Sequence, residues 1–154
     1  MIRLLCSGMV VFAGMASVPL AVAPQGGAEP AADYREDPRF EKLRAFFQKS
    51  DCPAQQYTSA FLEAADRYDL DWRLLPSLSY IESTGGKAAR NNNFFGWGTA
   101  QFVTPAAGIH EVGSRLAYSS LYRDKDLDTL LGTYNPLPEY AQKVKSVMRQ
   151  IAPW

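Results

Sequence analysis

Cysteine and histidine are scarce in this chain of 154 residues, which has two cysteines and one histidine. Neither residue type occurs in the paired spacing of a metal site, so no metal-binding motif is present. A Cys–His hydrolase would have to join Cys52 to His110, and no local motif supports that pairing. We interpret Cys52 as a small buried thiol and His110 as a surface or capping imidazole, and we expect no metal or other cofactor.

An excess of either charge is also missing, because 16 basic residues balance 16 acidic residues. Domains that bind nucleic acids are usually basic, so nothing indicates a nucleic-acid partner. A polymeric ligand would be held mainly by neutral contacts. The length and a hydrophobic content of 47% fit one globular domain, and we expect it to be a monomer.

Alternation of apolar and polar residues, which is typical of β-strands, is not convincing anywhere in the chain. The phosphate-binding glycine loop and the Gly-x-Ser-x-Gly nucleophile elbow are absent as well. Apolar residues instead recur at steps of three and four residues. This pattern predicts a mostly α fold, with at most a small hairpin or irregular loop over residues 87–103.

A long hydrophobic run occurs only at the N-terminus, where Arg3 precedes an apolar stretch that ends in the small residues Ala21-Val22-Ala23. This order predicts a secretory signal peptide at residues 1–23. The alternative is a retained membrane anchor. We favour export without stable membrane insertion after cleavage, because the run is short and is interrupted by Ser7, Gly14, Ser17 and Pro19. Cleavage leaves Cys52 as the only cysteine, so no internal disulfide is expected.

Residues 24–36 are rich in alanine, glycine and proline, and they predict a flexible leader before a domain at residues 37–154. Helix starts are expected at Asp37-Pro38, Thr104-Pro105 and Asp126, where a capping side chain precedes proline or an apolar period. A further helix is expected at about residues 54–68. The last helix has one apolar stripe, formed by Leu137, Tyr140, Ala141, Val144, Val147, Met148 and Ile151.

The stretch from residue 70 to residue 98 has the strongest functional signal, and it is centred on Glu82. Leu74, Leu75, Leu78 and Ile81 recur at helical spacing before it. We expect Asp71 to cap this helix, Pro76 to bend it, and Gly85 and Gly86 to end it. Glu82 then lies at the edge of the buried face, where partial loss of solvent favours the protonated carboxyl that a general acid needs.

A loop that combines amides with aromatic rings follows the helix, from Asn91-Asn92-Asn93 through Phe94-Phe95 to Gly96-Trp97. Sugars present hydroxyl and acetamido groups at their edges and C–H patches on their faces. Concave sites with aromatic walls and a few placed polar groups suit such ligands. The pattern predicts a glycan-binding groove beside Glu82, although an isolated glutamate near a helix end is usually a solvated surface charge.

Two further residues have competing interpretations. Tyr134 lies between two expected helices, where its phenol could donate a hydrogen bond to the substrate or could pack in the core with its hydroxyl bonded to backbone. Glu111 is a candidate second carboxylate, but sequence spacing does not place it opposite Glu82. We interpret Glu111 as a solvated helix residue.

These motifs together resemble the bacterial β-N-acetylglucosaminidase domain of cell-wall autolysins and flagellar muramidases. The resemblance covers roughly residues 54–151. Its motifs are Glu-Ser-x-x-Gly-Lys at residues 82–87, Asn-Asn-x-Phe-Gly at residues 92–96, Tyr134-Asn135-Pro136, and Tyr140 to Val144. It implies a lysozyme-like helical fold, with Glu82 and Tyr134 as catalytic residues. Implied substrate-binding residues are Ser83, Asn92, Asn93, Phe95, Trp97, Gln101, Asn135 and Tyr140.

Lytic transglycosylases are similar too, since they also carry Glu-Ser after an apolar helix. Gly98-Thr99-Ala100-Gln101 resembles their Gly-x-x-Gln loop, whereas Thr133 stands where their Ala-Tyr-Asn segment has alanine. The resemblances imply that the partner is the glycan strand of peptidoglycan, in the periplasm or the extracellular cell wall. They leave open whether the protein is a glucosaminidase, a transglycosylase or a non-catalytic glycan-binding module.

Overall fold

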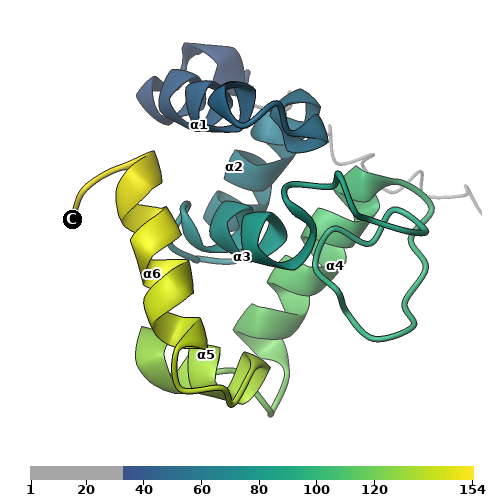
Figure 1. The fold of residues 1–154 in the computed structure, drawn as a ribbon, viewed down its shortest axis with the longest axis vertical. Helices are drawn as coiled ribbons and strands as arrows, with labels where there is room; N and C mark the ends of the chain where they lie inside the picture. Colours follow the sequence, from purple (N-terminus) through teal and green to yellow (C-terminus); the bar gives the residue numbers. More distant parts are fainter. Residues whose placement is uncertain (1–32) are drawn as a thin grey trace, which may run out of the picture. The chain divides into compact units, whose positions relative to one another are not determined.

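A computed structural model describes residues 33–154 (Figure 1). The predicted signal peptide and most of the predicted leader lie outside the described residues. Within residues 33–154 the elements are the 3-10 turns η1 (Tyr34–Glu36) and η2 (Pro53–Tyr57) and the helices α1 (Pro38–Lys49), α2 (Thr58–Arg67), α3 (Leu74–Ser83), α4 (Pro105–Tyr118), α5 (Leu127–Tyr134) and α6 (Tyr140–Ile151).

The mostly α class expected from the sequence is confirmed, and the architecture agrees with a lysozyme-like helical domain. Between α3 and α4 the chain forms an irregular loop whose only β feature is an isolated bridge between Arg90 and Asn93. None of the helices in residues 33–154 is long and apolar enough to cross a membrane.

Helix α3 lies at the centre of these elements, with α6 on one side and the long loop on the other (Figure 1). It packs against α6 and α2, and α2 packs against α4. The buried core between them includes Leu43, Phe47, Phe61, Leu62, Leu78, Phe95, Ile109, Leu116, Leu131, Val144 and Met148. The packing holds the C-terminal end of α3 in a fixed position beside the loop.

The three helix starts predicted from capping residues are confirmed. The Asp37 carboxylate accepts a hydrogen bond from the Arg39 N–H at 2.7 Å. The Thr104 hydroxyl accepts from the Ala107 N–H at 3.0 Å. Asp126 accepts from the Thr129 N–H at 2.8 Å. Each cap provides a partner for a backbone donor that has none within its helix.

Other boundaries differ from the expectation. The last residues of the predicted leader form η1, where the Tyr34 hydroxyl donates to Asp66 at 3.1 Å. The helix expected from residue 54 begins with the 3-10 turn η2, and α2 starts at Thr58. Leu137 lies before α6 and is 56% exposed, so it is not part of the buried stripe.

The central helix also begins later than predicted. Asp71 accepts from the Arg73 N–H at 2.9 Å in a turn before α3, whose N-cap is Arg73, so the predicted Asp71 cap is wrong. Pro76 is the third residue of α3, where a backbone N–H has no partner inside the helix. Proline at this position therefore removes no hydrogen bond within α3, and the reason for expecting a bend there does not apply.

The end of α3 is formed by three residues with left-handed backbone. Thr84 is the C-cap at φ 52°, and Gly85 and Gly86 follow at φ 59° and 94°. A Cβ atom on Gly86 would lie 2.6 Å from the Phe94 ring. Steric crowding therefore favours glycine at this position, where the pair was expected to end the helix. This turn directs the chain from α3 into the loop beside Glu82.

Candidate active site

Glu82 lies in the last turn of α3 and is partly buried. Its Oε1 atom accepts a hydrogen bond from the Tyr140 hydroxyl at 2.6 Å. Tyr140 is the first residue of α6 and is 4% exposed, so α6 fixes one oxygen of the carboxyl group. The other oxygen, Oε2, has no hydrogen-bond partner among residues 33–154.

Tyr134 and Tyr140 form a stacked pair behind Glu82, with ring centroids 5.9 Å apart and an interplanar angle of 9°. Burial raises the pKa of Tyr134, and burial together with the hydrogen bond to Glu82 raises the pKa of Tyr140. Both phenols therefore remain neutral hydrogen-bond donors at physiological pH. The Tyr134 hydroxyl donates to the Phe95 carbonyl at 2.7 Å, which is the backbone-satisfied alternative considered above.

Gly96 lies against the second oxygen of Glu82, Oε2. Its φ is +58°, and a Cβ atom at this position would lie 2.8 Å from Oε2. Glycine therefore has two functions here: it adopts a left-handed backbone, and it leaves Oε2 unobstructed. Any side chain at this position would require the Glu82 carboxyl group to shift.

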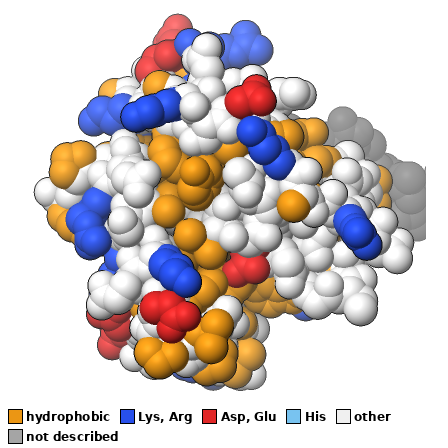
Figure 2. Space-filling view, viewed as in Figure 1, with side chains coloured by type: hydrophobic (Ala, Val, Ile, Leu, Met, Phe, Trp, Pro, Cys, Tyr) orange, Lys and Arg blue, Asp and Glu red, His pale blue; other side chains and the backbone are white. Residues whose placement is uncertain are grey.

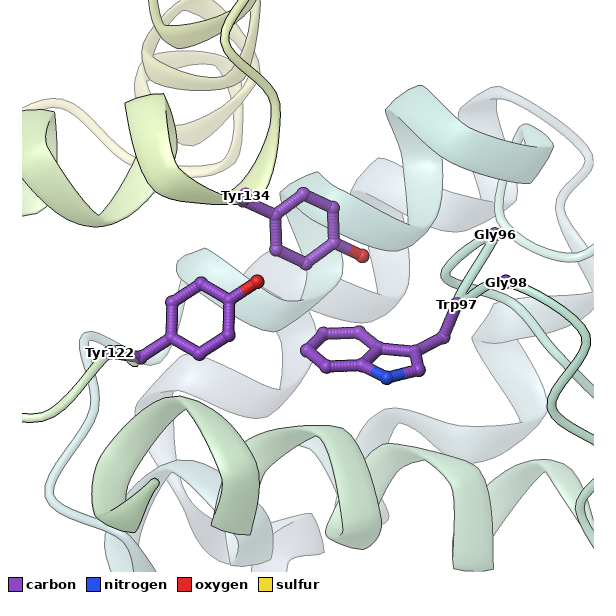
Figure 3. Close-up of a pocket in the computed structure, with 5 residues that line it drawn as sticks. All are labelled: Gly96, Trp97, Gly98, Tyr122 and Tyr134. Carbon is purple, nitrogen blue, oxygen red and sulfur yellow. The ribbon is translucent and has the colours of Figure 1, made fainter. Parts of the chain in front are cut away.

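A small aromatic pocket of about 160 Å³ lies on one side of Gly96 and Gly98. Figure 3 shows that the rings of Tyr122, Tyr134 and Trp97 surround it. Trp97 and Tyr134 contact each other in a T-shaped arrangement, with centroids 5.4 Å apart. This pocket offers aromatic faces to a ligand that approaches Glu82.

A larger pocket of about 480 Å³, lined mostly by polar residues, shares Gly96 and Gly98 with the aromatic one. Among residues 33–154, Glu82 is the only acidic residue that lines either pocket. The polar pocket also contains Arg90, Asn91, Thr99 and Gln101. The carboxyl group of Glu82 thus lies where an aromatic pocket and a polar pocket meet.

Of the predicted substrate-binding residues, Trp97 lines the aromatic pocket, and Ser83, Asn93 and Gln101 line the polar pocket. Phe95, by contrast, is 1% exposed and belongs to the core. Asn135 accepts from the Leu137 N–H at 3.1 Å and shapes the connection from α5 to α6. The prediction of direct sugar contact therefore fits only part of the expected set.

Ser83, Asn92 and Asn93 use their polar atoms to hold the loop. The buried Ser83 hydroxyl donates to the Phe94 carbonyl at 2.8 Å and accepts from the Gly86 N–H at 2.9 Å. Asn93 accepts from the N–H groups of Phe95 and Trp97 at 3.2 and 3.1 Å. Asn92 donates to the Phe102 carbonyl at 2.9 Å. These residues position the groove wall.

Two residues of the site were not predicted from the sequence. Tyr122 lines the aromatic pocket from the segment between α4 and α5, and Arg90 lines the polar pocket. Neither lies in a recognisable motif, and no periodic pattern marks them. The N-N-x-F-G motif begins two residues after Arg90, and this proximity is the only sequence signal that could have identified it.

The other candidate residues lie elsewhere. Cys52 is buried against Gly85, and burial raises the pKa of its thiol. His110 lies 3.8 Å from Glu63, and burial lowers the pKa of its imidazole. Glu111 is exposed and pairs with Arg115 at 2.7 Å. Across residues 33–154, no three His, Cys, Asp or Glu side chains are grouped closely enough to hold a metal ion.

No protein-family model matches the chain, and a comparison with curated proteins finds no significant match. The site is therefore defined by its own geometry: one partly buried carboxyl group, bonded to a buried phenol, in a polar pocket that shares Gly96 and Gly98 with an aromatic pocket.

Proposed function

We propose that this protein is an exported peptidoglycan hydrolase of the β-N-acetylglucosaminidase type, which cleaves β-1,4 glycosidic bonds with Glu82 as general acid. The observation that best supports the proposal is the position of Glu82 Oε2, which faces Gly96 where the two pockets meet. A polymer that occupies both pockets would pass directly over this oxygen.

The two pockets suit the two kinds of surface on an amino sugar. Trp97 and Tyr122 offer ring faces and edges to the C–H patches of a pyranose. Gln101 and Asn91 in the polar pocket offer amides to its hydroxyl and acetamido groups. Arg90 adds a positive charge that complements the carboxylates carried by peptidoglycan.

The mechanism begins with transfer of the Glu82 proton from Oε2 to the glycosidic oxygen as the bond from that oxygen to C1 breaks. The Tyr140 hydrogen bond to Oε1 persists as Glu82 becomes a carboxylate. Charge-assisted hydrogen bonds are stronger than neutral ones, so this contact stabilises the charge that develops on Glu82. Burial of Tyr140 keeps the donor in place without solvent reorganisation.

A second acid is not available among the residues that line these pockets. We therefore propose that the 2-acetamido oxygen of the substrate bonds to C1 as the leaving group departs. Water then adds to C1 as the bond from C1 to the acetamido oxygen breaks, and it gives one proton to the Glu82 carboxylate, which restores the acid. Substrate-assisted routes of this kind are known exceptions to the two-carboxylate scheme.

A lytic transglycosylase is the second candidate, and the Gly98–Gln101 segment favours it. This segment resembles the transglycosylase loop and lines the pocket that contains Glu82. In that reaction the C6 hydroxyl of muramic acid takes the place of water: its oxygen bonds to C1 as the bond from C1 to the acetamido oxygen breaks, and its proton passes to the Glu82 carboxylate. The product is a 1,6-anhydro sugar instead of a free reducing end.

Mass spectrometry of the soluble products from purified peptidoglycan tests the proposal. The mature protein should release fragments that end in reducible N-acetylglucosamine, and Glu82→Gln should release none while keeping its fold. Glu111→Gln is the matched control, because that exposed glutamate lies outside both pockets. Anhydro-muramic ends would identify a transglycosylase, and binding without fragments from any variant would identify a glycan-binding module.

A further inference from the structure

A third pocket, of about 530 Å³, lies away from Glu82 between α1, α3 and α6. Phe46 of α1 and Tyr80 of α3 form its aromatic floor, with ring centroids 5.1 Å apart. Lys42, Lys49, Ser50 and Gln150 form its polar rim. Figure 2 shows apolar side chains at the surface between α1 and α6, with basic side chains around them.

The charge of this pocket is one-sided. Its lining includes two lysines and no acidic residue. Arg44 lies between the two lysines on α1 and pairs with Glu41 at 2.9 Å, whereas neither lysine has a carboxylate partner among the described residues. The two ammonium groups are thus available to an anionic ligand whose apolar parts contact Phe46 and Tyr80.

We propose that this pocket binds the short acidic peptide stems carried by peptidoglycan, an inference that rests on the proposed function. Lys42 and Lys49 are seven residues apart, so they are separated by about 10 Å along the helix axis. Three residues of extended peptide span roughly the same distance. The pocket therefore matches a peptide with two carboxylates about three residues apart and small apolar side chains between them.

The position of the pocket relative to Glu82 supports this assignment. Tyr80 precedes Glu82 by two residues on α3, so their Cα atoms are roughly 5 Å apart and their side chains leave the helix in nearly opposite directions. The pocket consequently flanks the glycan groove and does not overlap it. A stem of five residues spans roughly 17 Å, which exceeds the diameter of a helix with its side chains, about 10–12 Å.

Equilibrium binding in the inactive Glu82→Gln background tests the inference. The ligands are purified glycan strands with their peptide stems and the same strands after enzymatic removal of the stems. Lys42→Gln with Lys49→Gln should weaken binding of the stem-bearing strands about fivefold, the size expected from two exposed ion pairs. Binding of the stripped strands should not change. The matched control is Arg67→Gln with Lys143→Gln, which removes two charges from exposed positions outside this pocket.

The outcomes separate this inference from the proposed function. Equal binding of stem-bearing strands by the lysine variant and its control would overturn the peptide site, while cleavage by the wild type would leave the hydrolase proposal intact. Nuclear magnetic resonance titration with a free stem peptide provides a second measurement. Shifts at Phe46 and Tyr80 that disappear in the lysine variant support the site even if the wild type cleaves no glycan.

Discussion

The Tyr140 hydroxyl donates a 2.6 Å hydrogen bond to Oε1 of Glu82, and this contact joins residues 58 positions apart in the chain. Glu82 is in the last turn of α3, whereas Tyr140 begins α6. The bond therefore depends on the packing of two helices. It leaves Oε2 as the oxygen that donates the proton in the proposed reaction, in which Tyr140 is a positioning residue.

Removing this hydroxyl tests that role. Tyr140→Phe should lower kcat about ten- to a hundredfold, because a hydrogen bond to a charged group contributes roughly 1.5–3 kcal/mol. Steady-state kinetics on solubilised glycan strands measures the effect. Tyr134→Phe is the comparison, since it removes the hydroxyl bonded to the Phe95 carbonyl and keeps the contact to Glu82. A larger kcat loss in Tyr134→Phe would contradict the assignment.

Gly96 and Gly98 provide a matched pair for a steric test. Both have left-handed backbone, at φ 58° and 53°, but only a Cβ atom on Gly96 would contact Glu82. Alanine at either position should lower the free energy of unfolding by about 1 kcal/mol. Only Gly96→Ala should also reduce kcat, by about tenfold or more, because it displaces the carboxyl group from Tyr140.

Thermal unfolding and kinetics on both variants separate these effects. Similar shifts in Tm with a selective loss of turnover in Gly96→Ala are expected. Equal turnover in the two variants would show that Oε2 does not need the space beside Gly96.

The helices and the position of Glu82 could be predicted from the sequence because they depend on local chemistry. Asp37, Thr104 and Asp126 cap helices through hydrogen bonds to backbone within three residues. Leu74, Leu75 and Leu78 bury one face of α3 by their spacing alone. Such signals are contained within a few residues and need no knowledge of the tertiary structure.

The contacts around Glu82 could not be predicted in the same way. The family resemblance implies a catalytic role for Tyr134 and a substrate-binding role for Tyr140. In the structure, Tyr140 is the residue that donates a hydrogen bond to Glu82. The choice depends on how α5 and α6 pack against α3. Tyr122 joins the site through the same packing, from a segment without a motif.

Substitutions of Asn93 test whether the amide side chains of the loop have a structural function. Its Oδ1 atom accepts from two backbone N–H groups, and the residue is 8% exposed. Asn93→Ala leaves both donors without this partner and should lower the free energy of unfolding by roughly 2 kcal/mol. Asn93→Asp keeps the acceptor but loses the Nδ2 donor to the Ala100 carbonyl at 3.3 Å, so it should recover only part of that loss. Chemical denaturation measures both variants, and a stable Asn93→Ala with impaired glycan binding would instead indicate direct sugar contact.

The ion pairs of Arg39 should make the stability of the fold depend on pH. Its guanidinium contacts Asp37 at 2.6 Å and Asp66 at 2.7 Å, and its hydrogen bonds lower the pKa of both carboxyl groups. A carboxyl group with a lowered pKa in the folded state stabilises the fold above its unfolded pKa, near 3.8, and loses that contribution as the pH falls through the folded value. Arg39→Gln should therefore lower Tm at pH 7, and its difference from the wild type should shrink as the pH falls below about 4. Both carboxylates are partly exposed, so a difference of a few degrees in Tm is expected.

Thermal melts at pH 7 and pH 3 measure this difference, with Arg44→Gln on the exposed side of α1 as the control. A difference that stays constant over this range would show that Arg39 stabilises the fold by packing and not by its charge.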